Sequence, residues 1–196
     1  MKKTVIIVLL AVLALVVITG ISAYNSLVTL EENVSKSWSN VEGQYQRRAD
    51  LIPNLVATVK GYAKHESETL EGVVAARAKA TQVTVDAEKL TPEKLQAFQA
   101  AQSEVSSALG RLLMIVENYP DLKANQNFLE LQAELAGTEN RIAVERSRFN
   151  EAAKLFNVAV RRFPNNVFAA IFGFSAKPYF EAEKGSQEAP KVSFES

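Results

Sequence analysis

The chain begins with a short basic stub that is followed by a long uncharged segment. Lys2 and Lys3 precede residues 4–23, TVIIVLLAVLALVVITGISA, in which no side chain is charged. A helix of about 20 apolar residues crosses roughly 30 Å of hydrocarbon. A cleaved signal peptide shares the basic start, but its apolar core usually has only about 7 to 15 residues. We therefore predict a retained transmembrane anchor with its cytoplasmic stub over residues 1–23.

The basic residues that flank the apolar run predict its orientation. Lys2 and Lys3 lie before it, whereas the segment after it carries Glu31, Glu32 and, as its first basic residue, Lys36. Positively charged residues concentrate on the cytoplasmic side of a span. We therefore predict a cytoplasmic N-terminus, with the rest of the chain in the periplasm or outside the cell.

Composition excludes several functional classes. The 196 residues carry 22 Lys+Arg and 22 Asp+Glu, so the formal net charge is zero. A neutral balance gives no general attraction to nucleic acid. The chain contains no cysteine, which removes disulfides, thiol nucleophiles and thiolate metal sites. We therefore predict no nucleic-acid partner and no cofactor.

Prolines divide the rest of the chain into helical stretches. Apolar residues recur every three or four positions between Pro53, Pro92, Pro120 and Pro164, which places them on one face of each helix. No useful strand-like alternation occurs, and the connections are mostly short, which favours antiparallel neighbours. The predicted helices cover residues 24–50, 53–83, 92–119 and 122–163.

These stretches predict an all-α chain. The N-terminal transmembrane helix continues into an antiparallel up-down four-helix bundle, and the C-terminal helix of the bundle is the longest. The predicted divisions are the anchor over residues 1–23, the bundle over residues 24–163, and an apolar, aromatic tail with a polar terminus over residues 164–196.

The stretch QYQRRADLIPNLV, residues 44–56, predicts a tight turn between the first two bundle helices. Pro53 would take the first helical position, which tolerates a missing N–H. An antiparallel bundle brings the junction between its third and fourth helices to the same end, where opposite charges would meet. We favour a structural clasp over a partner-binding tip or a catalytic cluster. The predicted clasp residues are Arg47, Arg48, Asp50, Pro53, Glu117, Asn118 and Asp121.

Polar residues at positions that the helical stripes would bury form a second predicted group. Buried polar groups need partners, so we expect Glu66 or Glu145 to pair with Arg141 or with the indole N–H of Trp38. We favour a satisfied layer that specifies helix register over a binding pocket inside the bundle. The predicted layer consists of Trp38, Glu66, Thr138, Arg141 and Glu145.

The tail after residue 163 is rich in aromatic residues, which is unusual for a solvated segment. Up-down topology returns the fourth helix toward the membrane, so the tail is predicted to begin near the bilayer. Two interpretations remain: packing over the open end of the bundle, which we favour, and insertion in the membrane interface. The residues concerned are Phe168, Ile171, Phe172, Phe174, Tyr179 and Phe180.

Catalytic motifs are not supported. His65 is the only histidine, and the fragment HESET has Thr69 where a zinc-binding HExxH motif needs its second histidine. Gly173-Phe174-Ser175-Ala176 fails the GxSxG pattern at its last position, and no glycine-rich phosphate loop is present. We therefore predict that the chain is not an enzyme.

Several long strings together resemble the LemA family. They are YNSLVTLEENV, WSNVEGQYQRRADLIPNLVATVKGYAKHE, ARAKA, ENYPDLKANQNFLELQAELAGTENRIAVERSRFNEA, RRFP and PYFEAE. The resemblance spans Tyr24 to about Glu183. It implies a bacterial single-pass membrane protein with an N-terminal anchor, an antiparallel helical bundle and no established catalytic activity. Some descriptions of the family place the N-terminus outside the cell, opposite to the orientation predicted from charge.

The anchor, the bundle and the aromatic tail together predict a non-enzymatic module of the bacterial envelope. The expected partners are the lipid bilayer and further copies of the chain, because small residues on helix faces permit close approach. Such copies would assemble laterally and organise or shape the membrane. The alternative is an envelope adaptor that binds another, unidentified protein through the membrane-distal tip of the bundle.

Overall fold

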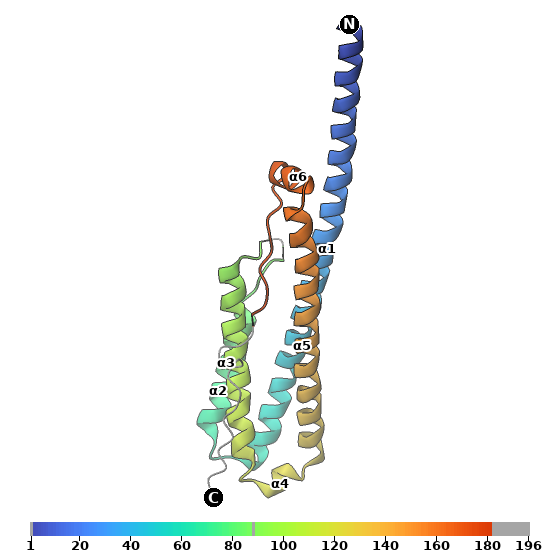
Figure 1. Cartoon of the computed structure of the whole chain (residues 1–196). Helices are drawn as coiled ribbons and strands as arrows, with labels where there is room; N and C mark the ends of the chain where they lie inside the picture. Colours follow the sequence, from blue (N-terminus) through green and yellow to red (C-terminus); the bar gives the residue numbers. More distant parts are fainter. Residues whose placement is uncertain (1, 88, 182–196) are drawn as a thin grey trace, which may run out of the picture.

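The computed structural model describes residues 2–87 and 89–181, and within these ranges every regular element is an α-helix. This confirms the all-α prediction. Figure 1 shows the elements in chain order. Their bounds are α1 Lys2–Tyr62, α2 Ser67–Gln82, α3 Pro92–Val116, α4 Pro120–Lys123, α5 Gln126–Arg161 and α6 Asn165–Phe172.

Helix α1 runs from the predicted anchor into the bundle without a break. Its N-terminal part projects alone beyond the other helices (Figure 1), and its large apolar side chains from Val5 to Ile18 are exposed. The most apolar window of α1 has a mean hydropathy of 3.1, which is sufficient for a membrane span by length and composition. From Leu27 onward, one face of the same helix is buried. The predicted continuity of anchor and bundle is therefore present.

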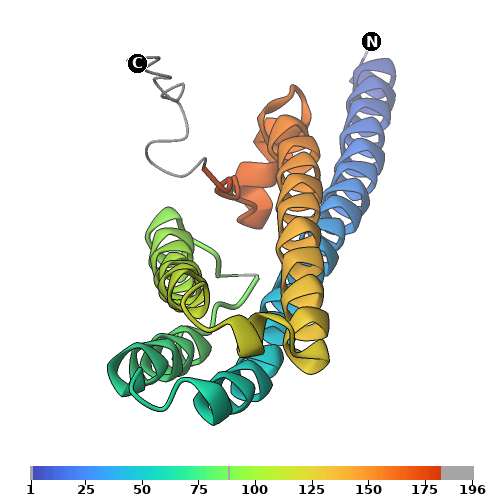
Figure 2. The same cartoon turned by 90° about the horizontal axis from the view of Figure 1, so that it is seen from below.

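The bundle consists of two helix pairs. Helix α1 packs along α5, helix α2 packs along α3, and α1 also contacts α2. Successive long helices run in opposite directions, and α4 forms the corner between α3 and α5 at the membrane-distal end (Figure 1). Seen from below, α3 stands apart from α5 (Figure 2), and an open groove lies between these two helices.

The core has a membrane-distal and a membrane-proximal part. The distal part is mainly aliphatic and joins α1, α2, α3, α4 and the start of α5. The proximal part is aromatic and centres on Trp38, whose ring lies 5.2 Å from that of Phe98 and 5.6 Å from that of Phe149, centroid to centroid. Aromatic side chains bury large areas, so this part fixes α1 against α5 and the start of α3.

The turn predicted at Pro53 is wrong. Helix α1 continues through Pro53, and the chain reverses after Tyr62, so the second bundle helix begins at Ser67. Proline lacks the N–H that would bond the carbonyl four residues earlier. That carbonyl belongs to Ala49, and Arg77 Nε on α2 donates to it over 2.6 Å. A side chain from the neighbouring helix thus replaces the missing hydrogen bond.

The long fourth helix predicted over residues 122–163 is divided into α4 and α5. Asn125 lies between them, and its Oδ1 accepts a hydrogen bond from the N–H of Phe128 over 3.0 Å, which caps α5. At the start of α3, the Thr91 hydroxyl caps the helix and accepts from Lys94 N over 3.3 Å. Helix α5 ends before Pro164, as expected for residues that precede a proline.

Candidate functional site

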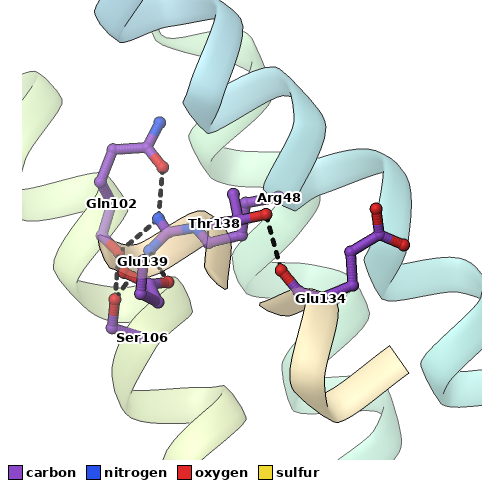
Figure 3. A network of polar contacts seen from close by, with 6 residues as sticks. All are labelled: Arg48, Gln102, Ser106, Glu134, Thr138 and Glu139. Atoms are coloured by element: carbon purple, nitrogen blue, oxygen red, sulfur yellow. Dashed lines mark hydrogen bonds and ion pairs between the residues drawn. The ribbon is translucent and has the colours of Figure 1, made fainter. Parts of the chain in front are cut away.

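Arg48 lies inside the bundle, where it joins three helices. Its side chain is only 2% exposed. One terminal nitrogen donates to Ser106 Oγ over 2.9 Å and to Glu139 Oε1 over 2.7 Å. The other donates to the backbone oxygen and to Oε1 of Gln102, over 3.1 and 2.7 Å. Figure 3 shows these groups converging on the guanidinium. A buried charge requires such partners, and here they connect α3 to α5 across the groove between them.

Tyr45 contacts the same arginine. The Arg48 guanidinium carbon lies 5.1 Å from the centroid of the Tyr45 ring, and Phe98 packs edge-on against that ring at 5.1 Å. Burial raises the pKa of the Tyr45 hydroxyl above its ordinary value, although the positive charges of Arg146 and Arg48 act in the opposite direction. The neutral form of Tyr45 is therefore favoured in the folded chain.

The predicted clasp does not form at the tip of the bundle. Arg47 pairs with Glu134 of α5, and Arg48 pairs with Glu139. No contact within the described ranges joins either arginine to Glu117, Asn118 or Asp121. The physical reason is the uninterrupted α1, because the helix continues for fourteen residues after Arg48, or about 20 Å.

The predicted clasp contacts are also absent at three further residues, namely Asp50, Glu117 and the predicted turn residue Pro53. Asp50 Oδ1 accepts a hydrogen bond from Gln46 Nε2 on its own helix over 2.7 Å. Glu117 pairs with Lys123 across the corner between α3 and α5. Pro53 lies within α1. The predicted clasp set is therefore distributed between the middle of the bundle and its distal end.

Other residues close the membrane-distal tip. The Tyr119 hydroxyl donates to Glu66 Oε1 over 2.9 Å, and Asn125 Nδ2 donates to the Tyr62 hydroxyl oxygen over 2.9 Å. The hydrogen bond to the Glu66 carboxylate raises the pKa of Tyr119. These contacts tie the loop between α1 and α2 to the corner at α4.

The predicted polar layer is wrong as a single layer. Glu66 lies at the distal tip, whereas Trp38 lies in the membrane-proximal core. The Trp38 indole N–H donates to the backbone oxygen of Val85 over 3.1 Å, in the segment between α2 and α3. Neither residue makes the predicted pairing, because the turn after α1 lies further along the chain than the sequence pattern indicated.

The three remaining layer residues, all on α5, make local contacts. Thr138 Oγ1 donates to the Glu134 carbonyl over 2.8 Å and accepts from Arg141 over 3.1 Å (Figure 3 shows the first of these). Glu145 pairs with Arg148 one turn later at 2.6 Å. Its buried Oε2 has no hydrogen-bond partner among the described residues. The predicted pairing of Glu145 with Arg141 is absent.

The chain after α6 returns along α5 as an extended strap, residues 174–181. Asn157 Nδ2 donates to Lys177 O, and Asn157 Oδ1 accepts from Lys177 N, both over 2.8 Å. Asn150 forms the same pair with Phe180, over 3.0 and 2.8 Å. Seven helical residues rise about 10.5 Å, and three extended residues span about 10 Å. The spacing of the two asparagines therefore matches that of the strap backbone.

Two side chains anchor this strap to the bundle. Phe180 is buried, stacks on Trp38 at 5.9 Å and packs edge-on against Phe149 at 5.3 Å. The Lys177 ammonium pairs with Glu31 Oε1 of α1 at 2.7 Å. The strap thus holds α1 and α5 together on the membrane side of the bundle. Of the predicted tail residues, Phe180 packs inside the bundle, away from the end of the apolar run.

Helix α6 packs against α1 at the end of the apolar run. Gly20 lies against the ring of Phe168, because a Cβ atom at position 20 would be only 2.9 Å from Phe168 Cε1. Tyr24 packs edge-on against Phe172 at 5.0 Å and lies 5.8 Å from the ring of Phe174. Glycine at position 20 therefore permits the close approach that holds α6 at the level of the last turn of the anchor.

The outer face of this junction is apolar and exposed. Phe163 is 78% exposed and Ile171 is 68% exposed, although both are large apolar residues. Tyr179, another predicted tail residue, is exposed further along the strap. We use the name junction patch for the exposed residues Phe163, Val167, Ile171 and Phe172.

Comparison with known proteins assigns the chain to a family. The LemA family model matches residues 37–194, which is most of the chain. The chain belongs to the LemA family. Residues 37–194 include Asn150, Asn157, the strap and the Arg48 network. The contacts described above that reach outside this range are those of Gly20 and Tyr24 with residues 168–174 and the Lys177 pair with Glu31.

Individual relatives extend the LemA match. The chain is 31% identical to magnetosome protein MamQ 2 of Paramagnetospirillum magneticum, over 89% of the chain and 70% of the relative. It is 32% identical to magnetosome protein MamQ of Magnetospirillum gryphiswaldense, over 93% and 74%. It is 26% identical to protein LemA of Metamycoplasma hominis, over 82% and 69%. None of these names refers to a reaction.

Sequence reasoning missed the residues that hold the strap and the proline. Asn150 and Asn157 are separated by seven residues on one helix face, a signal that could have indicated paired polar contacts. Arg77 lies within the LemA-like string ARAKA. Its partner, the Ala49 carbonyl, could not be inferred from the sequence as long as Pro53 was assigned to a turn. Among the described residues, no group of three or more His, Cys, Asp or Glu side chains could hold a metal ion.

Proposed function

We propose that this LemA family member is a non-enzymatic, membrane-anchored protein that assembles laterally with copies of itself and thereby organises or shapes the membrane. The observation that carries the proposal is an exposed apolar stripe along α5. We name it the α5 stripe; its members are Leu129, Val144, Leu155 and Val158, each between 44% and 55% exposed. Successive members are 15, 11 and 3 residues apart, which is close to four turns, three turns and one turn of an α-helix, so they share one face.

The position of the α5 stripe suits contact between neighbouring copies in one membrane. Helix α5 runs alongside α1 (Figures 1 and 2), so a stripe on α5 faces sideways when α1 stands in a bilayer. Large apolar side chains that are exposed on one face of a helix are candidates for a contact surface. The junction patch at the membrane end of α5 would bring the same contact close to the lipids.

The construction of the bundle supports a mechanical role. The anchor and the core share a single helix, and the strap fastens that helix to α5 through Lys177 and Phe180. Lateral contacts made by the bundle would therefore be transmitted to the membrane-spanning segment. The magnetosome relatives, whose names state a cellular structure and no reaction, agree with a structural role.

Cysteine crosslinking in native membranes tests lateral assembly. The chain has no cysteine, so Val144→Cys or Val158→Cys introduces a single thiol on the α5 stripe. In a symmetric dimer a residue near the two-fold axis meets its own copy, so we expect crosslinked dimers for at least one variant. Lys94→Cys, at an exposed position on α3, is the matched control and should remain monomeric. Monomers for every variant, together with monomers by native-membrane electron microscopy, would contradict the proposal.

An adaptor role is the alternative, and one surface favours it. A groove of about 520 Å³ lies between α1 and α2 toward the membrane-distal end, with an apolar floor that includes Val56, Leu70 and Val74. Lys60, Lys64 and Glu71 also line it, so its charge is net positive and a partner segment with apolar and acidic residues would fit. Affinity capture with Val74→Glu separates the roles, because loss of a partner with unchanged stripe crosslinking would favour the adaptor.

The orientation belongs to the proposal as well. We place the N-terminus in the cytoplasm and the bundle in the periplasm or outside the cell, because Lys2 and Lys3 precede the span. A membrane-impermeant thiol reagent applied to whole cells, or to cells with a permeabilised outer membrane, should label Lys94→Cys. Labelling only after lysis would reverse the orientation without affecting lateral assembly.

A further inference from the structure

We propose that Arg161 and Arg162 form a binding site for the phosphate of an anionic phospholipid, in the leaflet that adjoins the bundle. The site lies at the membrane end of α5, where that helix finishes and the chain turns into α6. This inference concerns one copy of the chain and does not depend on lateral assembly.

The depth of the site follows from the contacts of α6. Phe168 on α6 covers Gly20, which belongs to the last turn of the apolar run, and Phe172 packs on Tyr24 just beyond it. Helix α6 therefore lies where the hydrocarbon meets the headgroups. Only the residues Phe163 and Pro164 separate Arg162 from α6. The two arginines are thus held close to the level of the lipid phosphates.

A hollow beside the arginines has room for a headgroup. It encloses an open volume of about 360 Å³ and is lined by Asn157, Val158, Arg161, Arg162 and Tyr179. None of these lining residues is acidic. The arginine fork can donate two parallel hydrogen bonds to phosphate oxygens, so the chemistry of the hollow fits an anion with several acceptor oxygens.

Both arginines are available for such a ligand. Their side chains are exposed, and none of the ion pairs within the described ranges involves them. By contrast, Arg47, Arg48 and Arg148 on the same two helices each pair with a glutamate.

The junction patch distinguishes a lipid from a free phosphate. Phe163 directly follows the two arginines and is 78% exposed, and Ile171 on α6 is 68% exposed. An exposed apolar surface beside basic residues binds the boundary between headgroups and acyl chains. Basic residues near an anionic membrane surface each strengthen association by on the order of fivefold. We therefore expect both parts of a phospholipid to be bound, its phosphate by the arginines and its acyl chains by the patch.

The test compares lipids around the full-length protein in bilayer nanodiscs. Spin-labelled phosphatidylglycerol and phosphatidylcholine are added separately, and the immobilised fraction of each gives the relative association constant. The wild type should prefer phosphatidylglycerol by on the order of tenfold or more, since two basic residues contribute. The double variant Arg161→Gln with Arg162→Gln should lose most of this preference. Both side chains are exposed, so the fold, checked by circular dichroism, should be retained.

A matched double variant and two further arms complete the test. Arg148→Gln with Lys154→Gln removes two exposed cations of α5 that do not line the hollow and should leave the preference unchanged. Ile171→Ser should weaken the association of both lipids. Competition by inorganic phosphate at constant ionic strength should be negligible. Equal preference in the two double variants, or full displacement by inorganic phosphate, would overturn the lipid site.

Discussion

Arg77 on α2 donates a hydrogen bond to the Ala49 carbonyl of α1 over 2.6 Å, and this oxygen is the one that Pro53 leaves without a helical partner. A proline inside a helix costs about 3 kcal/mol or more, partly because a backbone acceptor loses its donor. The arginine supplies that donor from outside the helix. The pair allows α1 to continue past Pro53 to Tyr62.

We expect Arg77→Met to destabilise the bundle by about 1 to 3 kcal/mol, because a partly buried carbonyl is left unsatisfied. Chemical unfolding of the full-length protein in detergent measures this cost. Pro53→Ala restores the helical N–H, so Arg77→Met should cost about 1 kcal/mol less in that background. An equal cost in the two backgrounds would show that Arg77 does not compensate for the proline.

The Arg48 network should depend strongly on its acidic partner. Glu139→Ala leaves a guanidinium that is 2% exposed without its counter-charge, and we expect a loss of about 1 to 3 kcal/mol in the free energy of unfolding. Glu134→Ala is the matched control, because the Arg47–Glu134 pair is exposed on both sides and such pairs contribute at most about 1 kcal/mol. Similar losses for the two variants would refute the central role of Arg48.

The asparagine pairs should control the opening of the strap. Asn157→Asp keeps an acceptor for Lys177 N but cannot donate to Lys177 O. We expect the amide hydrogens of Lys177 and Phe180 to exchange about tenfold faster, which corresponds to roughly 1.4 kcal/mol for one lost hydrogen bond. Asn140→Asp, at an exposed position on the same helix, is the control. Unchanged exchange in Asn157→Asp would mean that Phe180 alone holds the strap.

The buried Tyr45 hydroxyl predicts a loss of stability at alkaline pH. Burial raises the pKa of this hydroxyl in the folded chain, so its stabilising contribution is complete below the ordinary tyrosine pKa of about 10. It is lost as the pH rises from there through the raised folded pKa, because the unfolded chain ionises first. Tyr45→Phe should weaken the dependence of the free energy of unfolding on pH in this range. An unchanged slope in Tyr45→Phe would contradict this prediction.

The sequence was informative wherever local chemistry decides the structure. The uncharged run, the Thr91–Pro92 start of α3 and the helical spacing of apolar residues each reflect nearby residues alone. Pro53 was misplaced because proline preference is a local rule, whereas the hydrogen bond that overrides it comes from Arg77, far along the chain. That single error shifted the predicted turn, and it moved the predicted clasp and the pairing of Glu66 with it.

The contacts of the tail depend on three-dimensional matching that no local rule supplies. Aromatic density near residues 168–180 predicted packing or membrane insertion for the segment as a whole. In the structure, Phe180 packs on Trp38, while Ile171 remains exposed at the junction. Ile171 and Phe180 differ because two separate contacts place them. The glycine at position 20 lets α6 pack against α1, and the asparagine spacing on α5 aligns the strap.

Because α1 is unbroken, any tilt of the anchor is also a tilt of the first bundle helix. Beyond residue 23 the helix continues to Tyr62, which is about 60 Å at 1.5 Å per residue. Membrane spans tilt by about 20° on average and change their tilt with bilayer thickness. Because α1 is a single helix over this length, a tilt of about 20° displaces its far end sideways by about 20 Å. A change in bilayer thickness that alters the tilt of the span would thereby move the far end of the bundle.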